Sequence, residues 1–125
     1  IKLDLRDITE YVADGLVLST ATGSTAYNLS AGGPILTPES ANIIVSAICP
    51  HTISMRPIVI DRPVIAVLRR GRQAILTADG QNFLPLTEGD KINIYRSELK
   101  TRFIRFAEYD FFAKVRQVFR FGARS

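Results

Sequence analysis

The sequence contains one cysteine, Cys49, one methionine, Met55, one histidine, His51, and no tryptophan. A single cysteine excludes an internal disulfide and favours a reducing compartment, which we expect to be the cytoplasm. Zinc sites use about four ligands, so one cysteine and one histidine do not predict a metal site. No apolar run approaches the roughly 20 residues of a membrane span, and we expect no membrane partner.

Nearly half of the 125 residues, 46%, are apolar, which is enough to form the core of one ordinary domain. The formal net charge is +4, carried mostly by arginine, and a positive balance favours an anionic partner such as the phosphates of a nucleotide. The arginines are scattered except for Arg69, Arg70 and Arg72, so the pattern does not predict a nucleic-acid surface. Because the chain opens at Ile1, we expect it to be a piece of a longer protein.

Short apolar runs separated by turn residues predict strands over most of the chain. Asp79-Gly80 between two such runs is typical of a β-hairpin, because the tight turn requires positive φ angles. Short strands at regular spacing favour a mainly β, sandwich-like domain over repeated βαβ units. The predicted strands cover residues 16–20, 43–48, 63–68, 74–78, 83–86 and 91–95, with a weaker candidate at 102–106.

The stretch from Thr22 to Gly33, TGSTAYNLSAGG, concentrates glycine and hydroxyl residues around one tyrosine. A short helix is predicted here, capped by Thr22 or Ser24 and ended by Gly32-Gly33-Pro34. Its glycine-containing loop and the unpaired N–H groups of the helix start suit an anion or the polar edges of a nucleotide. Tyr27 either stacks on a base or packs in the core. The stretch lacks the patterns of a P-loop and of a nucleophile elbow.

A second short helix is predicted near the C-terminal end, at residues 110–121. Asp110 is its expected N-cap, and Arg116 and Arg120 lie near its negative C-terminal end. Five large apolar residues recur at helical spacing and fall on one face. These residues are Phe111, Phe112, Val115, Val118 and Phe119.

Three other positions have both a structural and a functional interpretation. Asp14 either only forms a turn with Gly15 or also accepts hydrogen bonds from ribose hydroxyls beside the TGSTAY loop. Gln81 either only ends the Asp79-Gly80 turn or is also presented by it. His51 is a candidate base, although a lone histidine beside a proline is more often structural.

Taken together, these motifs resemble the C-terminal domain of NAD kinases. TGSTAY followed by SAGGP and then by CPHT and RP carries most of the similarity, which extends over nearly the whole chain. The matching stretches are 14–38, 47–60 and 78–81, with looser matches at 88–97 and 110–122.

The resemblance implies an enzyme that transfers a phosphoryl group from ATP, or in some members from polyphosphate, to the adenosine ribose 2′-hydroxyl of NAD. Mg²⁺ or another divalent cation is expected with ATP. Family members combine an N-terminal α/β domain, which carries a catalytic Gly-Gly-Asp-Gly motif, with a C-terminal β-rich domain that supplies much of the NAD site. Residues 1–125 correspond to this second domain, and homodimers or homotetramers are expected.

The resemblance also implies which residues bind NAD. Asp14 corresponds to the family's Asp-Gly aspartate, Thr22 to its STPTGST loop and Tyr27 to its adenine-stacking tyrosine. Gln81 corresponds to a residue that contacts NAD in some members. The NAD-binding turn and helix correspond to Thr25, Ala26, Tyr27, Asn28, Leu29 and Ser30.

The sequence departs from the family pattern in several places. Ala21 stands where the loop usually has a proline, and Val12 where many members have an arginine. The chain contains no Gly-Gly-Asp-Gly motif and no Asn-Glu pair, so we expect no catalytic residue here and no kinase activity from these residues alone. A related lipid-kinase domain and a nucleotide-binding module without kinase activity are the alternatives.

Overall fold

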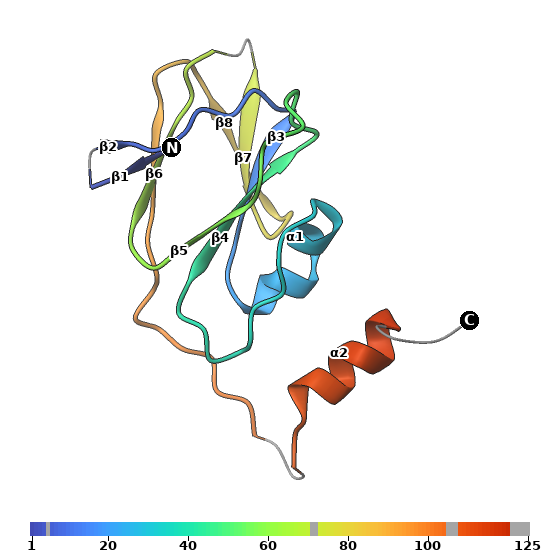
Figure 1. Ribbon diagram of the computed structural model, residues 1–125. Helices are drawn as coiled ribbons and strands as arrows, with labels where there is room; N and C mark the ends of the chain where they lie inside the picture. The colour runs from blue at the N-terminus through green and yellow to red at the C-terminus, as the bar shows by residue number, and fades with distance from the viewer. Residues whose placement is uncertain (5, 71–72, 105–107, 121–125) are drawn as a thin grey trace.

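The structure is a computed structural model that describes residues 1–4, 6–70, 73–104 and 108–120. Strands outnumber helices among these residues, which confirms the predicted mainly β fold (Figure 1). The elements are β1 (Lys2–Leu3), β2 (Arg6–Asp7), β3 (Gly15–Ser19), the 3₁₀ helix η1 (Thr22–Thr25), α1 (Tyr27–Ser30), β4 (Ile43–Ile48), β5 (Ile58–Ile60), β6 (Val64–Val67), β7 (Ala74–Ala78), β8 (Asn82–Leu86), β9 (Lys91–Ile94) and α2 (Phe111–Phe119).

The described strands form three antiparallel sheets. Their orders are β2-β1-β6-β9, β3-β4-β5 and β7-β8. In the second sheet β4 is central, with Val45 opposite Leu18 on one side and Ile58 on the other. All but the last residue of β4 are buried, so this strand is covered on both faces of its sheet.

A hydrophobic core joins the two larger sheets. Val45, Ile60 and Val64 form its buried centre, and they come from both sheets. Leu16 and Leu18 alternate along β3 so that both face this centre, as period-2 spacing requires. Further partly buried side chains surround it, namely Ile1, Leu3, Tyr11, Ile58 and Ile94. The opposite face of β4 is thereby left for the segment that contains α1.

The predicted strands agree with the structure to within one residue at most ends. Two strands of two residues, β1 and β2, and the three-residue β5 were not predicted, because such short runs carry no periodic signal. The candidate strand at 102–106 is wrong for residues 102–104, which have no regular structure, and its last two residues lie outside the described part of the chain.

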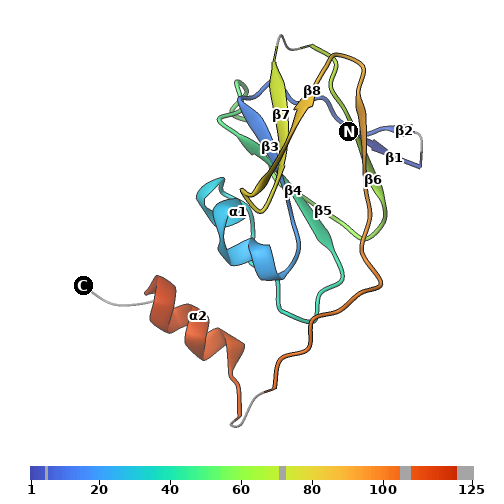
Figure 2. The same ribbon diagram turned by 180° about the vertical axis from the view of Figure 1, so that it is seen from behind.

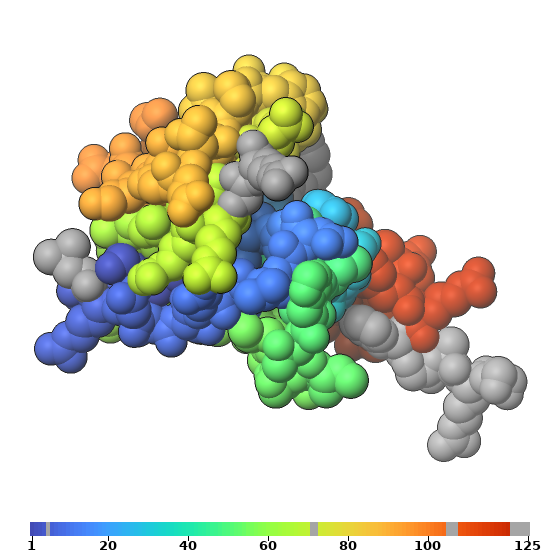
Figure 3. All heavy atoms as spheres, turned by 90° about the horizontal axis from the view of Figure 1, so that it is seen from above, coloured from blue at the N-terminus to red at the C-terminus, as the bar shows by residue number. Residues whose placement is uncertain are grey.

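Helix α2 begins where the sequence predicts. The Asp110 carboxylate accepts a 3.0 Å hydrogen bond from the Ala113 N–H, which confirms it as the N-cap. Val115 is buried, whereas Phe112 and Val118 on the predicted apolar face remain exposed. The helix projects from one side of the strand body (Figures 1 and 3). In the described part of the chain, no helix has the length and apolar character needed to span a membrane.

Candidate functional site

The TGSTAY segment follows β3 and does not form the single capped helix that the sequence predicts. The 3₁₀ turn η1 and the one-turn helix α1 are separated at Ala26, whose φ of −100° and ψ of −132° lie outside the helical region. Neither Thr22 nor Ser24 caps a helix, so that prediction is wrong. The Ser24 hydroxyl instead donates to the Ala21 carbonyl at 2.6 Å and accepts from the Leu36 N–H at 3.1 Å.

One side of this segment is exposed and carries no charge. The Tyr27 side chain is 60% exposed, which excludes the alternative that it packs in the core. Thr22, Ala26 and Ser30 are also exposed, while Thr25 and Leu29 are half-buried. Hydroxyl groups beside exposed backbone can form hydrogen bonds to the edges of a neutral ring system, and the tyrosine ring offers a planar face for stacking.

The other side of the segment is buried against β4. The Asn28 side chain is 1% exposed, and its amide nitrogen donates to the carbonyls of Ser24 at 3.0 Å and Pro34 at 3.1 Å. Its amide oxygen accepts a 2.8 Å hydrogen bond from the hydroxyl of Ser46, a residue of β4. Asn28 is a predicted ligand contact, but the structure places its side chain inside the fold.

Two glycines end the segment, and only the second lacks space for a side chain. Gly32 has a φ of +77°, the left-handed conformation that closes many helices, with open space around it. Gly33 is buried, and a Cβ there would lie 2.0 Å from the Asn28 amide oxygen. The Gly33 N–H also donates to the Asn28 carbonyl at 2.8 Å.

Asp14 precedes β3 and the TGSTAY segment follows it, and α1 of that segment lies beside the β3–β4 sheet (Figure 2). An extended strand rises about 3.3 Å per residue, so roughly 20 Å separate Asp14 from Thr20. Helix α1 then turns back to contact β3, and the contact of Asp14 with a ribose stays a prediction. The Asp14 N–H donates a hydrogen bond to the Ile48 carbonyl, and the His51 N–H donates one to the Val12 carbonyl. Asp14 therefore lies near the Cys49–His51 turn.

Gln81 lies at the exposed end of the β7–β8 hairpin, which confirms the predicted turn. Asp79 and Gly80 have φ angles of +49° and +70°, and the Gln81 N–H donates to the Ala78 carbonyl at 3.0 Å. Positive φ at both central positions is the geometry that Asp-Gly favours. The Gln81 side chain is presented to solvent at the tip of this two-stranded sheet.

The sequence pattern of the ATP-NAD kinase C-terminal domain matches residues 1–106 of this chain. The chain therefore belongs to the NAD kinase C-terminal domain family. NAD kinases from Geotalea daltonii and Trichlorobacter lovleyi are 38% and 42% identical to it over 98% and 94% of its length. The chain spans 44% and 42% of these two relatives, less than half of each.

Solved structures of NAD kinases have a similar fold. The structure of an NAD kinase from Archaeoglobus fulgidus in complex with ATP superposes with a TM-score of 0.65 and 32% identity, over 73% of this chain and 35% of that one. Yeast NADH kinase complexed with NADH gives a TM-score of 0.60 and 34% identity, over 74% and 28% of the two chains. These matches favour an NAD kinase domain over the lipid-kinase alternative.

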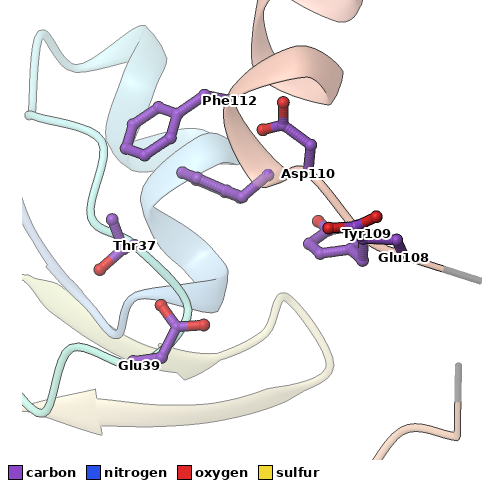
Figure 4. A pocket seen from close by; sticks show the side chains of 7 residues that line it. Thr37, Glu39, Glu108, Tyr109, Asp110 and Phe112 are labelled. Carbon is purple, nitrogen blue, oxygen red and sulfur yellow. The ribbon is translucent and has the colours of Figure 1, made fainter.

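A cleft of about 650 Å³ lies between the segment after α1 and the start of α2, and no residue of the TGSTAY segment lines it. Thr37 and Glu39 form one wall, and Glu108, Tyr109, Asp110, Phe111 and Phe112 form the other (Figure 4). The Asp110 carboxylate is already occupied as the cap of α2. No group of three or more metal-ligating side chains occurs among the described residues of this NAD kinase domain.

Proposed function

We propose that this chain is the NAD-binding half of an NAD kinase that makes NADP by phosphorylating the adenosine ribose 2′-hydroxyl of NAD. The observation that carries this proposal is the exposed, uncharged edge of the TGSTAY segment in a chain of this family. Tyr27 stacks on the adenine, while the hydroxyls of Thr25 and Ser30 and the backbone at Ala26 bond its polar edge and the ribose. Thr22 and Leu29 complete the wall of the site.

Asp14 and Gln81 need a separate account, because both lie outside the TGSTAY segment. We propose that Asp14 and Gln81 contact a more distant part of an extended dinucleotide, or close the NAD site of a neighbouring copy. Self-association into a homodimer or homotetramer fits the second arrangement.

The phosphoryl donor and the divalent cation are proposed to bind mainly outside this chain. ATP is the donor we favour, because the A. fulgidus relative is described in complex with ATP, and polyphosphate is the alternative. The residues described here do not provide a metal site of their own, so Mg²⁺ is expected to arrive with ATP. The catalytic aspartate is expected in a Gly-Gly-Asp-Gly motif that these 125 residues do not contain. This chain contributes by positioning the acceptor, which is a major part of phosphoryl-transfer catalysis.

The proposed function is tested by assaying the protein that contains this chain with ATP, Mg²⁺ and NAD, and in parallel with a lipid acceptor. We expect NADP formation and no lipid phosphorylation. A polypeptide of residues 1–125 alone is assayed beside it and is expected to be inactive. Lipid phosphorylation without NADP would overturn the proposal, and NADP made by residues 1–125 alone would show that the catalytic groups lie in this chain.

Self-association is tested separately by sedimentation of the same protein over a dilution series. We expect a dimer or tetramer at all but the lowest concentrations, because the β7–β8 hairpin leaves Ile75, Phe83 and Leu84 exposed. A monomer that turns over NAD at every concentration would remove the need for a neighbouring copy at the site.

A further inference from the structure

Asn28 lies in the middle of the proposed binding segment, yet its side chain is fully engaged inside the fold. The two amide N–H groups and the amide oxygen together bond three different parts of the chain, at Ser24, Pro34 and Ser46. Two of these partners lie on either side of the α1 turn, and the third lies on β4. One side chain therefore ties the start and the end of the segment to the central strand of the sheet.

Ser24 adds a second connection of the same kind. Its hydroxyl is fully buried, donates to the Ala21 carbonyl and accepts from the Leu36 N–H. The 3₁₀ turn before Tyr27 is thus bonded to the segment that follows Pro34. Ser46 is equally buried and is a polar residue in the otherwise apolar run IIVSAI. Burial of its hydroxyl costs free energy unless a polar partner accepts its hydrogen bond.

None of these three side chains is accessible to a ligand, whereas Thr25 after Ser24 is half-buried and Tyr27 before Asn28 is exposed. Tyr27 lies directly before Asn28 and is exposed, and the backbone at Ala26 departs from the helix between the two connections. We propose that Asn28, together with Ser24 and Ser46, forms a positioning network that holds the Thr25–Tyr27 backbone in its binding conformation without touching the nucleotide. This inference rests on the proposed binding of NAD at this segment.

Gly33 packs closely against the network. The Asn28 carboxamide lies against Gly33 so closely that a Cβ there would meet all three of its terminal atoms within 2.5 Å. Three hydrogen bonds and this contact with Gly33 hold the carboxamide in place. A fixed carboxamide pre-organises the segment, so less free energy is lost when a ligand orders it.

Steady-state kinetics of the NAD-converting protein test the network through the variant Ser46→Ala. This change removes only the hydrogen bond to the Asn28 amide oxygen, and that oxygen is then buried without its donor. The KM for NAD is expected to rise about three- to tenfold, the range that one buried hydrogen bond corresponds to. The KM for ATP and kcat are expected to stay unchanged, since the donor and the catalytic groups are proposed to lie mainly outside this chain. Asn28→Ala, which removes three bonds, is expected to raise the KM for NAD further.

Val45→Ala is the matched control, because Val45 precedes Ser46 in β4 and points into the core cluster on the other face. It lowers thermal stability without touching the network, so the KM for NAD is expected to remain that of the wild type below the unfolding transition. A KM for NAD that rises as much in Val45→Ala as in Ser46→Ala, or in neither, would overturn the positioning role. Absence of NAD turnover in the wild type would instead overturn the proposed function, and this inference with it.

Discussion

The α1 segment and the β1–β2 ribbon are both connected to the body of the domain by polar side chains, but in opposite ways. Around α1 the connecting side chains are neutral and buried, and they bond mostly to backbone carbonyls. At the ribbon they are charged and exposed. There Asp7 pairs with Lys2 and Arg69 at 3.3 and 3.2 Å, and Asp4 pairs with Arg62 at 3.2 Å.

This difference has an energetic consequence. A buried hydrogen bond that loses one partner leaves a desolvated polar group, which costs about 1–3 kcal/mol. Exposed ion pairs lose little when broken, because water and salt replace the partner. Substitutions in the α1 segment should therefore affect stability and binding strongly, while those in the ribbon should have small effects that depend on pH.

The largest effect is expected for Gly33→Ala. The added Cβ would lie 2.0 Å from the Asn28 amide oxygen, and the Asn28 carboxamide is held by three hydrogen bonds. Overpacking of this kind costs about 1–3 kcal/mol, and we expect the upper end because the displaced group also loses its hydrogen bonds. Thermal or urea unfolding of the protein measures the loss.

Gly32→Ala is the control for this prediction, because Gly32 has open space around it and only an unfavourable φ. We expect a cost of about 1 kcal/mol for an alanine in the left-handed conformation. The double variant Asn28→Ala with Gly33→Ala removes the clash, so the two substitutions should be less destabilising together than their sum. Full additivity would show that Gly33 and Asn28 do not constrain each other.

The next effect is expected for Tyr27→Ala on the binding of NAD. Stacking of a base on an aromatic side chain is worth about 1–3 kcal/mol, and the ring is mostly exposed, so its removal should cost little stability. Calorimetric titration of NAD should show affinity weakened about tenfold or more, and Tyr27→Phe should keep most of it. Equal affinity of wild type and Tyr27→Ala, with unchanged thermal unfolding, would contradict the stacking role.

Features set by residues close in sequence were predictable. The Asp79-Gly80 hairpin and the Asp110 cap of α2 depend on neighbours within a few positions, and both agree with the structure. The helix after Thr22 was predicted wrongly because its break depends on distant partners. Ser24 bonds Leu36, and Asn28 bonds Ser46, 18 residues away, and neither pairing has a local signal. The serine within IIVSAI was the one visible sign that a polar group packs against β4.

The candidate site shows the same difference between features set by sequence neighbours and features set by distant partners. Exposure of Tyr27 agrees with a binding role, but no sequence pattern separates an inward Asn28 from an outward Tyr27 in a turn that short. Asp14 was placed beside the loop because only a few residues separate them. The five-residue strand β3 lies between them, and the ribose contact of Asp14 stays a prediction.

The smallest effect is expected at the ribbon, for Asp7→Asn. The hydrogen bond from Lys2, with the nearby charges of Lys2 and Arg69, lowers the pKa of the Asp7 carboxyl below its ordinary value. A lowered folded-state pKa means that the ionised carboxylate stabilises the fold above the pKa of the unfolded chain, about 3.9. That contribution is lost as the pH falls through the lowered pKa.

Asp7→Asn should therefore unfold at a slightly lower temperature than the wild type at pH 7, and at the same temperature once the carboxyl is protonated. Added salt should shrink the difference at pH 7, because exposed charges are screened. Glu88→Gln removes the charge of an exposed carboxylate without a partner among the described residues, and it is the matched control for the unfolding temperature at pH 7. A loss at pH 7 as large as that of Ser46→Ala, or one insensitive to salt, would mean that the ribbon is held as firmly as the α1 segment and would remove the contrast between them.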